Sequence, residues 1–167
     1  MNHTLSHKIA LKPNRAQEDY FRRACGTARF AYNWALAEWN RQYEAWKKDN
    51  SLPKPSAAAL GRQLNAIKRE KFPWMLEVTK CAPQRAIQNL GEAFKRYFKN
   101  KSKFNHPKFK KKGKSRDSFY IDNTVFKVED KRIKIPKLGE VRMRENLRFE
   151  GKILSATTRL LRRRGVR

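Results

Sequence analysis

The chain has 167 residues, with 41 lysines and arginines against 15 aspartates and glutamates, a formal net charge of +26 at pH 7. Such an excess repels itself, which argues against an ordinary metabolic enzyme and predicts a protein that binds a polyanion. No apolar run approaches the roughly 18 residues of a membrane-spanning helix, and the polar opening MNHTLSHKIALKPN does not have the pattern of a signal peptide. We therefore expect no membrane partner.

The positive charge is spread along the whole chain. Residues 1–98 have a net charge of +10, residues 99–116 of +9 and residues 117–167 of +7. An excess in every part predicts a molecule that contacts polyanion over much of its surface. The two cysteines, Cys25 and Cys81, have neither metal-site nor redox spacing.

Apolar residues alternate over residues 5–11, which predicts a short strand. Asn14 then suits the N-cap of a helix, with Gln17 at the capping-box position. Gly26 is expected to interrupt this helix, so that a second helix covers residues 27–48 and the helical part has a helix-turn-helix-like start.

The helix predicted over residues 27–48 carries a stripe of large aromatic side chains: Trp34, Trp39, Tyr43 and Trp46. Their helical spacing favours packing in the core over stacking on bases. Trp39 is the least regular member and is the best candidate for an exposed ring. Ser56 can cap a third helix, which KFPW ends, and a fourth helix is predicted to begin near Pro83.

After residue 116 the hydrophobic period changes to two, as in strands. The segments SFYI, TVFKVED, RIKIPKLG, EVRMRE and GKILSAT read as short strands, with Asp130 and Lys131 as a hairpin turn. The first strand is most simply paired with these later ones. The predicted fold is α+β, a small split β-barrel with a helical domain inserted after its first strand. The predicted parts are the first barrel strand 1–13, the helical domain 14–98, a basic linker 99–116, the remaining barrel strands 117–157 and an arginine-rich tail 158–167.

The basic linker has nine cations and no acidic residue, and we predict that these cations bind phosphates: Lys99, Lys101, Lys103, Lys108, Lys110, Lys111, Lys112, Lys114 and Arg116. Phe104 and Phe109 lie among them, and aromatic rings stack on unpaired bases with about 1–3 kcal/mol each. The alternative is a flexible linker with two incidental phenylalanines.

The start of the fourth helix places Lys80, Gln84 and Arg85 close together. Helix N-termini attract phosphates and glutamine pairs with adenine edges, so these residues are candidates for DNA contact, although an ordinary polar helix face is the alternative. His3 and His7 lack a third ligand, and no aspartate stands in an Asp-x-Gly pattern after a strand. The residues thus predict no metal site, no cofactor and no catalytic residue.

Several phrases resemble one family in order and spacing: KIALKPNRAQEDYFRRACGTARFAYNWAL, KCAPQRAIQNLGEAFKRYF, HPKFKKKGKSRDSFYI, IKIPKLGEVRMRE and GKILSAT. They are similar to the amino-terminal half of TnpB (OrfB), the transposon-encoded RNA-guided DNA nucleases related to type V CRISPR effectors. The resemblance covers about residues 5–156. It implies a wedge-like barrel split by a helical recognition domain, and a bacterial or archaeal protein of the cytoplasm, associated with the nucleoid.

In this family the wedge and recognition domains hold a structured guide RNA and read a short DNA motif beside the target. Carried over by position, the resemblance implies that Lys80, Gln84, Asn123 and Thr124 contact DNA. Cys81 and Asp122 among them depart from a simple donor pattern, which leaves the DNA motif undefined.

Family members continue into a RuvC-like nuclease domain, whereas this sequence ends at Arg167. Residues 158–167 hold five arginines and no lysine, while the earlier chain has 22 lysines and 14 arginines, which suggests a reading-frame shift or early stop. The expected function is a nucleic-acid-binding fragment without nuclease activity of its own. The alternatives are a half that complements a separately encoded RuvC nuclease, a ribosomal-type RNA-binding protein, or the product of a decayed gene.

Overall fold

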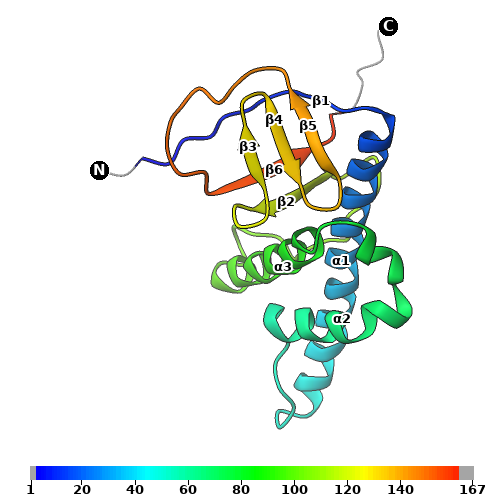
Figure 1. The fold of residues 1–167 in the computed structure, drawn as a ribbon. Coiled ribbons are helices and arrows are strands. Elements are labelled where there is room, and N and C mark those ends of the chain that lie inside the picture. Colours follow the sequence, from blue (N-terminus) through cyan, green and yellow to red (C-terminus); the bar gives the residue numbers. More distant parts are fainter. Residues whose placement is uncertain (1–2, 162–167) are drawn as a thin grey trace, which may run out of the picture.

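A computed structural model describes residues 3–161 of the chain as an α+β fold (Figure 1). In this view α2 and α3 lie below two antiparallel sheets, α1 runs from beside the sheets down past α3, and the small sheet lies between the larger sheet and α3. The elements in chain order are β1 (Leu11–Lys12), α1 (Arg15–Lys48), α2 (Ala57–Lys71), the 3-10 helix η1 (Pro73–Glu77), α3 (Cys81–Lys99), β2 (Ser118–Asp122), β3 (Lys127–Glu129), β4 (Arg132–Ile135), β5 (Gly139–Met143) and β6 (Ser155–Arg159).

Helix α1 begins as predicted, but it is one helix where the sequence predicted two. The Asn14 side chain accepts from the Gln17 backbone N–H at 2.9 Å, and the Asn14 N–H donates to the Gln17 side chain at 3.0 Å, which completes the capping box. The expected interruption at Gly26 is wrong, because the helix runs unbroken through it. A helical glycine costs only about 1 kcal/mol, and burial of Ala24 and Ala28 on either side outweighs that cost.

Trp39 is buried, and the prediction that its ring is the best exposed candidate is wrong. Only 9% of its surface is accessible, and its indole stacks on the Phe94 ring of α3 with centroids 4.3 Å apart and planes 8° apart. Trp34 and Tyr43 are partly buried against the same core, whereas Trp46 is not part of it, so the packing that the spacing favoured holds for three of the four rings.

The other two helices begin and end near their predicted positions. The Ser56 hydroxyl accepts from the Ala59 N–H at 3.2 Å and caps α2, which ends before Pro73. Helix α3 begins two residues before Pro83. Helices α2 and α3 approach closely at Gly91, where an added Cβ would lie 2.7 Å from the Cβ of Ala57.

The strands confirm the predicted pairing of the first strand but do not close into a barrel. The larger sheet has the order β1-β5-β4-β3, so the helices are inserted between β1 and its sheet partners. β2 pairs only with β6 in a separate sheet, and the described residues contain no ladder that joins the two sheets. With two residues in β1 and three in β3, the larger sheet has short edges, and closure would require longer pairing there.

The hairpin turn at Asp130 is confirmed, because β3 and β4 pair on either side of it and Asp130 has a φ of +49°. The last strand lies further along the chain than predicted. β6 continues through Thr158 and Arg159, which the sequence assigned to the arginine-rich tail, since their partners in β2 extend to Ser118. The remaining part of that predicted tail, residues 162–167, lies outside the described residues.

One hydrophobic core joins the helices and both sheets. Phe119 and Ile121 of β2 are buried between the helical layer and Ile135 and Val141 of the larger sheet. Burial raises the pKa of the Cys25 thiol to about 12, so this cysteine is a core residue and not a nucleophile. Among the described residues, no helix is long and apolar enough to cross a membrane.

Candidate nucleic-acid interface

The basic linker is docked on the helical layer and is not a free ribbon. The side chain of Asn33 on α1 donates to the Lys110 carbonyl at 2.9 Å and accepts from the Lys110 N–H at 2.8 Å. Pro107 is buried, and His106 lies edge-on to Phe94 and Tyr97 with ring centroids 5.2 Å apart in each case. These contacts hold the linker backbone in one course against α1 and α3.

The end of the linker is fixed by an ion pair between Arg29 of α1 and Asp117, which immediately precedes β2. Both side chains are at least three-quarters buried, with 19% and 25% of their surfaces accessible. A paired charge at this depth contributes more to the order of the chain than a fully exposed pair would. The linker is therefore held at both ends and in its middle.

Eight of the nine predicted phosphate-binding cations are exposed, and no salt bridge in the described part of the chain involves them: Lys99, Lys101, Lys103, Lys108, Lys111, Lys112, Lys114 and Arg116. Lys110 differs from the others. Its ammonium lies over the Tyr32 ring, 4.2 Å from the centroid, and burial lowers its pKa. Lys110 thus holds the linker to α1, and its charge is turned away from solvent.

The two linker phenylalanines have different surroundings. Phe109 has 53% of its surface exposed, so its ring is accessible for stacking on a base. Phe104 is half-buried, with the Lys103 ammonium 5.7 Å from its ring centroid. Of the two, Phe109 has the more accessible face.

The start of α3 lies beside β2 and brings the predicted DNA-contacting residues to one side of the molecule. Lys80, Gln84 and Arg85 are exposed, and the Arg85 guanidinium lies over the Tyr120 ring of β2 at 4.5 Å. Such stacking orients the guanidinium, one N–H of which donates to the Gln88 side chain at 3.3 Å.

The backbone at this helix end does not offer the phosphate site that the sequence suggested. The Cys81 N–H donates to the Thr79 hydroxyl at 3.3 Å, and the Ala82 N–H donates to the Thr79 carbonyl at 3.2 Å. Pro83 has no N–H. Contact with nucleic acid at this helix end must therefore come from side chains.

The turn after β2 is organised by Asp122. One carboxylate oxygen accepts from the Thr124 N–H at 3.0 Å and from the Thr124 hydroxyl at 2.8 Å, and these bonds lower the Asp122 pKa. Thr124 is exposed, whereas the Asn123 amide donates to the Ile153 carbonyl at 2.8 Å. The Asn123 amide is thus engaged within the protein, and Asn123 is only partly exposed.

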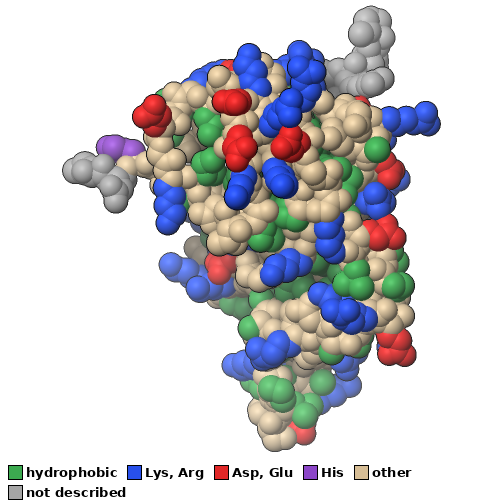
Figure 2. All heavy atoms as spheres, viewed as in Figure 1, with side chains coloured by type: hydrophobic (Ala, Val, Ile, Leu, Met, Phe, Trp, Pro, Cys, Tyr) green, Lys and Arg blue, Asp and Glu red, His purple; other side chains and the backbone are tan. Residues whose placement is uncertain are grey.

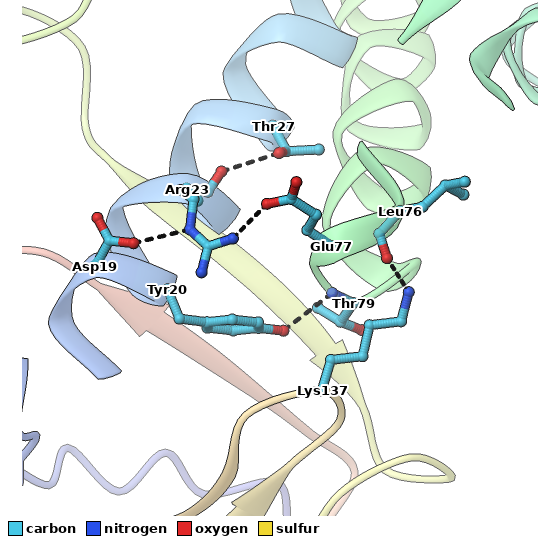
Figure 3. Close-up of polar contacts among 8 residues, drawn as sticks. All are labelled: Asp19, Tyr20, Arg23, Thr27, Leu76, Glu77, Thr79 and Lys137. Carbon is cyan, nitrogen blue, oxygen red and sulfur yellow. Dashed lines mark hydrogen bonds and ion pairs between the residues drawn. The ribbon is translucent and has the colours of Figure 1, made fainter. Parts of the chain in front are cut away.

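Tyr20 joins the helical layer to the larger sheet (Figure 3). Its hydroxyl accepts from the buried Thr79 N–H at 3.0 Å and donates to the Pro136 carbonyl at 2.9 Å. Burial raises the pKa of Tyr20, so the hydroxyl stays protonated and can donate. This junction fixes the start of α3 relative to the turn between β4 and β5.

We expect Tyr20→Phe to lower the free energy of unfolding by about 1–3 kcal/mol, because it leaves the Thr79 N–H buried without an acceptor. Urea denaturation followed by circular dichroism measures this change. Tyr32→Phe is the matched control, since the Tyr32 hydroxyl makes no hydrogen bond within the described residues and its loss should cost less. Equal effects of the two substitutions would contradict the role of Tyr20.

Sequence reasoning missed the cations on the outer face of the larger sheet. The register places exposed Lys12, Arg142 and Arg132 side by side across β1, β5 and β4. Glu140 pairs with Arg132 at 2.9 Å, so this face is mixed in charge, as Figure 2 shows. The signal in the sequence was the period-two alternation of RIKI and EVRM, in which every second residue faces out.

No group of three or more histidine, cysteine, aspartate or glutamate side chains that could hold a metal ion occurs among residues 3–161. The Oδ1 atom of Asp122 is occupied by Thr124, and Asp117 is occupied by Arg29. The described surface offers exposed cations around an ordered linker backbone, together with the exposed aromatic ring of Phe109 within that linker.

Comparison with known proteins gives a family and several relatives. Residues 1–48 match the family model HTH_OrfB_IS605, described as a helix-turn-helix domain. Over 157 residues the chain is 31% identical to the "Putative RNA-guided DNA endonuclease InsQ" of Escherichia coli (strain K12), covering 94% of this chain and 38% of that protein. Over 184 residues it is 28% identical to the "Putative RNA-guided DNA endonuclease Rv2885c" of Mycobacterium tuberculosis (strain ATCC 25618 / H37Rv), covering 96% and 39%.

These matches confirm the resemblance found in the sequence. Within the described part of this match, residues 3–48, the elements are β1 and α1, and no turn divides α1. The chain spans less than two-fifths of the length of the curated relatives it matches.

Proposed function

Because the chain is homologous over 94% of its length to a protein named as an RNA-guided DNA endonuclease and carries a match to a transposon-type helix-turn-helix domain, we propose that it binds structured RNA and target-adjacent DNA. The observation that carries this proposal is the docked linker. An ordered backbone presents eight exposed cations in 18 residues without a carboxylate partner, and phosphates are the complementary ligand.

We assign RNA to the linker surface and DNA to the surface formed by the start of α3 and the turn after β2. The linker cations hold RNA phosphates, and Phe109 stacks on an unpaired base. Lys80, Gln84, Arg85 and Thr124 contact DNA, with Gln84 suited to a base edge and Arg85 to a guanine or a phosphate. Asn123 supports this surface, because its amide bond to the Ile153 carbonyl holds the turn after β2 in place.

The split barrel remains part of the proposal. β6 has one partner, β2, and its other edge carries unpaired backbone groups in the described structure. Leu154 and Leu161 beside it are 54% and 70% exposed. A further strand added at this edge would extend the small sheet and cover these side chains. This edge also supports the second candidate function, in which the chain complements a separately encoded nuclease polypeptide.

The test is a titration of labelled nucleic acid with the purified chain, followed by fluorescence anisotropy from 50 to 300 mM salt. We expect binding of an RNA hairpin and of a DNA duplex, with an affinity that falls steeply as salt rises, because each neutralised phosphate adds about 0.9 to the logarithmic slope on B-form DNA. We expect no Mg²⁺-dependent cleavage by this chain alone.

Absence of binding to both ligands at 150 mM salt would overturn the proposal. Cleavage that depends on Mg²⁺ and disappears on substitution of one aspartate would overturn the expected lack of nuclease activity. Co-purification with a RuvC-containing polypeptide would favour the complementation function, and co-sedimentation with ribosomes would favour a ribosomal-type protein.

A further inference from the structure

A shallow groove of about 480 Å³ lies at the end of the larger sheet that is nearest α3. It runs between the turn after β2 and the turn between β4 and β5. Its floor includes Val125 and Leu138, and its rim carries Lys127, Lys134 and Lys137. Lys127 and Lys134 are direct partners across the β3–β4 ladder, and Glu140, which faces Lys134 from β5, makes its salt bridge with Arg132.

The Tyr20 junction brings two further parts of the chain to the same corner. Its hydroxyl binds both Thr79 and Pro136, so Lys80 and Lys137, the residues that follow them, lie near each other. The Lys137 ammonium also donates to the Leu76 carbonyl of η1 (Figure 3). Lys137 is therefore held in place by a neutral acceptor that leaves its charge uncompensated.

Lys68, in the last turn of α2, belongs to this corner as well. Its half-buried ammonium donates to the Asn65 side chain at 2.7 Å. Burial lowers the pKa of Lys68, and the charges of Arg69, Lys137 and Lys80 lower it further. A cation repelled by lysines from α3 and from the sheet has those lysines within electrostatic range.

The acidic residue nearest to Lys80 in sequence is paired elsewhere. Glu77 of η1 is engaged by Arg23 at 2.5 Å, and Arg23 also binds Asp19 at 3.0 Å. Within residues 3–161, neither Lys68 nor Lys137 has a carboxylate within salt-bridge distance. Lys68 of α2 thus lies within electrostatic range of Lys80, which precedes α3, and of Lys137, which lines the groove. None of the three makes a salt bridge within residues 3–161.

We propose that Lys68, Lys80 and Lys137 bind a backbone phosphate of a nucleic-acid strand that runs through this groove past Thr124. The inference rests on the proposed function and adds to it two residues, Lys68 and Lys137, outside the predicted DNA-contacting set. Lysine suits this role because its ammonium is a compact charge that needs no planar partner. The groove is large enough for one nucleotide, being within the roughly 300–1,000 Å³ of small-ligand sites.

The experiment compares Lys68→Met with Lys48→Met, a control that removes one lysine at the far end of α1. Each variant is titrated with a 20-base-pair DNA duplex and with an RNA hairpin across the same salt series. For Lys68→Met we expect the slope on the duplex to fall by about 0.9 and the affinity at 0.1 M salt to fall about eight-fold. Lys68→Arg should restore both, and a thermal melt shows that each variant is folded.

The two probes distinguish the source of the phosphate. A loss confined to the duplex assigns the groove to DNA, and a loss confined to the hairpin assigns it to RNA. If Lys68→Met and Lys48→Met behave alike on both probes while the unmodified chain binds, the groove site is wrong and the proposed function stands. If the unmodified chain binds neither probe, the proposed function itself fails.

Discussion

Replacing Lys108, Lys111, Lys112 and Lys114 together by alanine should lower the affinity for duplex DNA or structured RNA on the order of a thousand-fold at 0.1 M salt. Each exposed lysine that loses a phosphate releases about 0.9 fewer counterions on a duplex, so the logarithmic salt slope should fall by about 3 to 4. The fold should persist, because the four side chains are exposed. Anisotropy titrations across a salt series measure both quantities.

Lys110→Met is the matched control within the same segment. Its ammonium lies on the Tyr32 ring and its backbone is held by Asn33, so we expect the salt slope to stay the same. If this variant reduced the slope as much as loss of an exposed neighbour such as Lys112, the assignment of Lys110 to the docking contact would be wrong. An unchanged salt slope for the quadruple variant would show that the linker is not part of the nucleic-acid interface.

Trp39→Ala should lower the free energy of unfolding by about 3–5 kcal/mol, since truncation of a buried tryptophan leaves a large cavity. The indole is stacked on Phe94 and 9% exposed, so the loss comes from the helical core. Urea denaturation gives the change in stability. Single-stranded RNA binding by the folded fraction should be unaffected.

Phe109→Ala is the opposite case and the control for Trp39→Ala. Its ring is 53% exposed, so we expect little change in stability and a loss of about 1–3 kcal/mol in binding to single-stranded RNA. A stable Trp39→Ala variant with weakened RNA binding would instead support an exposed stacking role for the indole.

Local signals predicted where α1 and α2 begin and where the β3–β4 hairpin turns, whereas the strand predicted over residues 5–11 is only Leu11–Lys12. The Asn14 capping box, the Ser56 cap and the turn at Asp130 depend on residues three or fewer positions apart, and the structure has all three. The break predicted at Gly26 was wrong because the low helix propensity of glycine is a small effect compared with tertiary burial. The helix that contains Gly26 packs along α3. Closure of the sheets depends on long-range pairing, which alternation alone does not specify.

The sequence predicted which charged residues the candidate site contains, but not the tertiary contacts that position them. The sequence identified the linker cations, but it did not reveal that Asn33 holds Lys110 from 77 residues away. It also missed Lys68 and Lys137, because tertiary contacts such as those of Tyr20 with Thr79 and Pro136 and of Lys137 with Leu76 bring these parts of the chain together. Residues that meet through tertiary contacts leave no local pattern in a single sequence.

The unbroken course of α1 sets a length scale for whatever the protein holds. Its 34 residues form a rod of about 51 Å, which corresponds to roughly fifteen base pairs at 3.4 Å per step. Without a joint at Gly26 the rod cannot fold back on itself. A single duplex that touched both the sheet end and the far tip would therefore have to be at least about one and a half helical turns long.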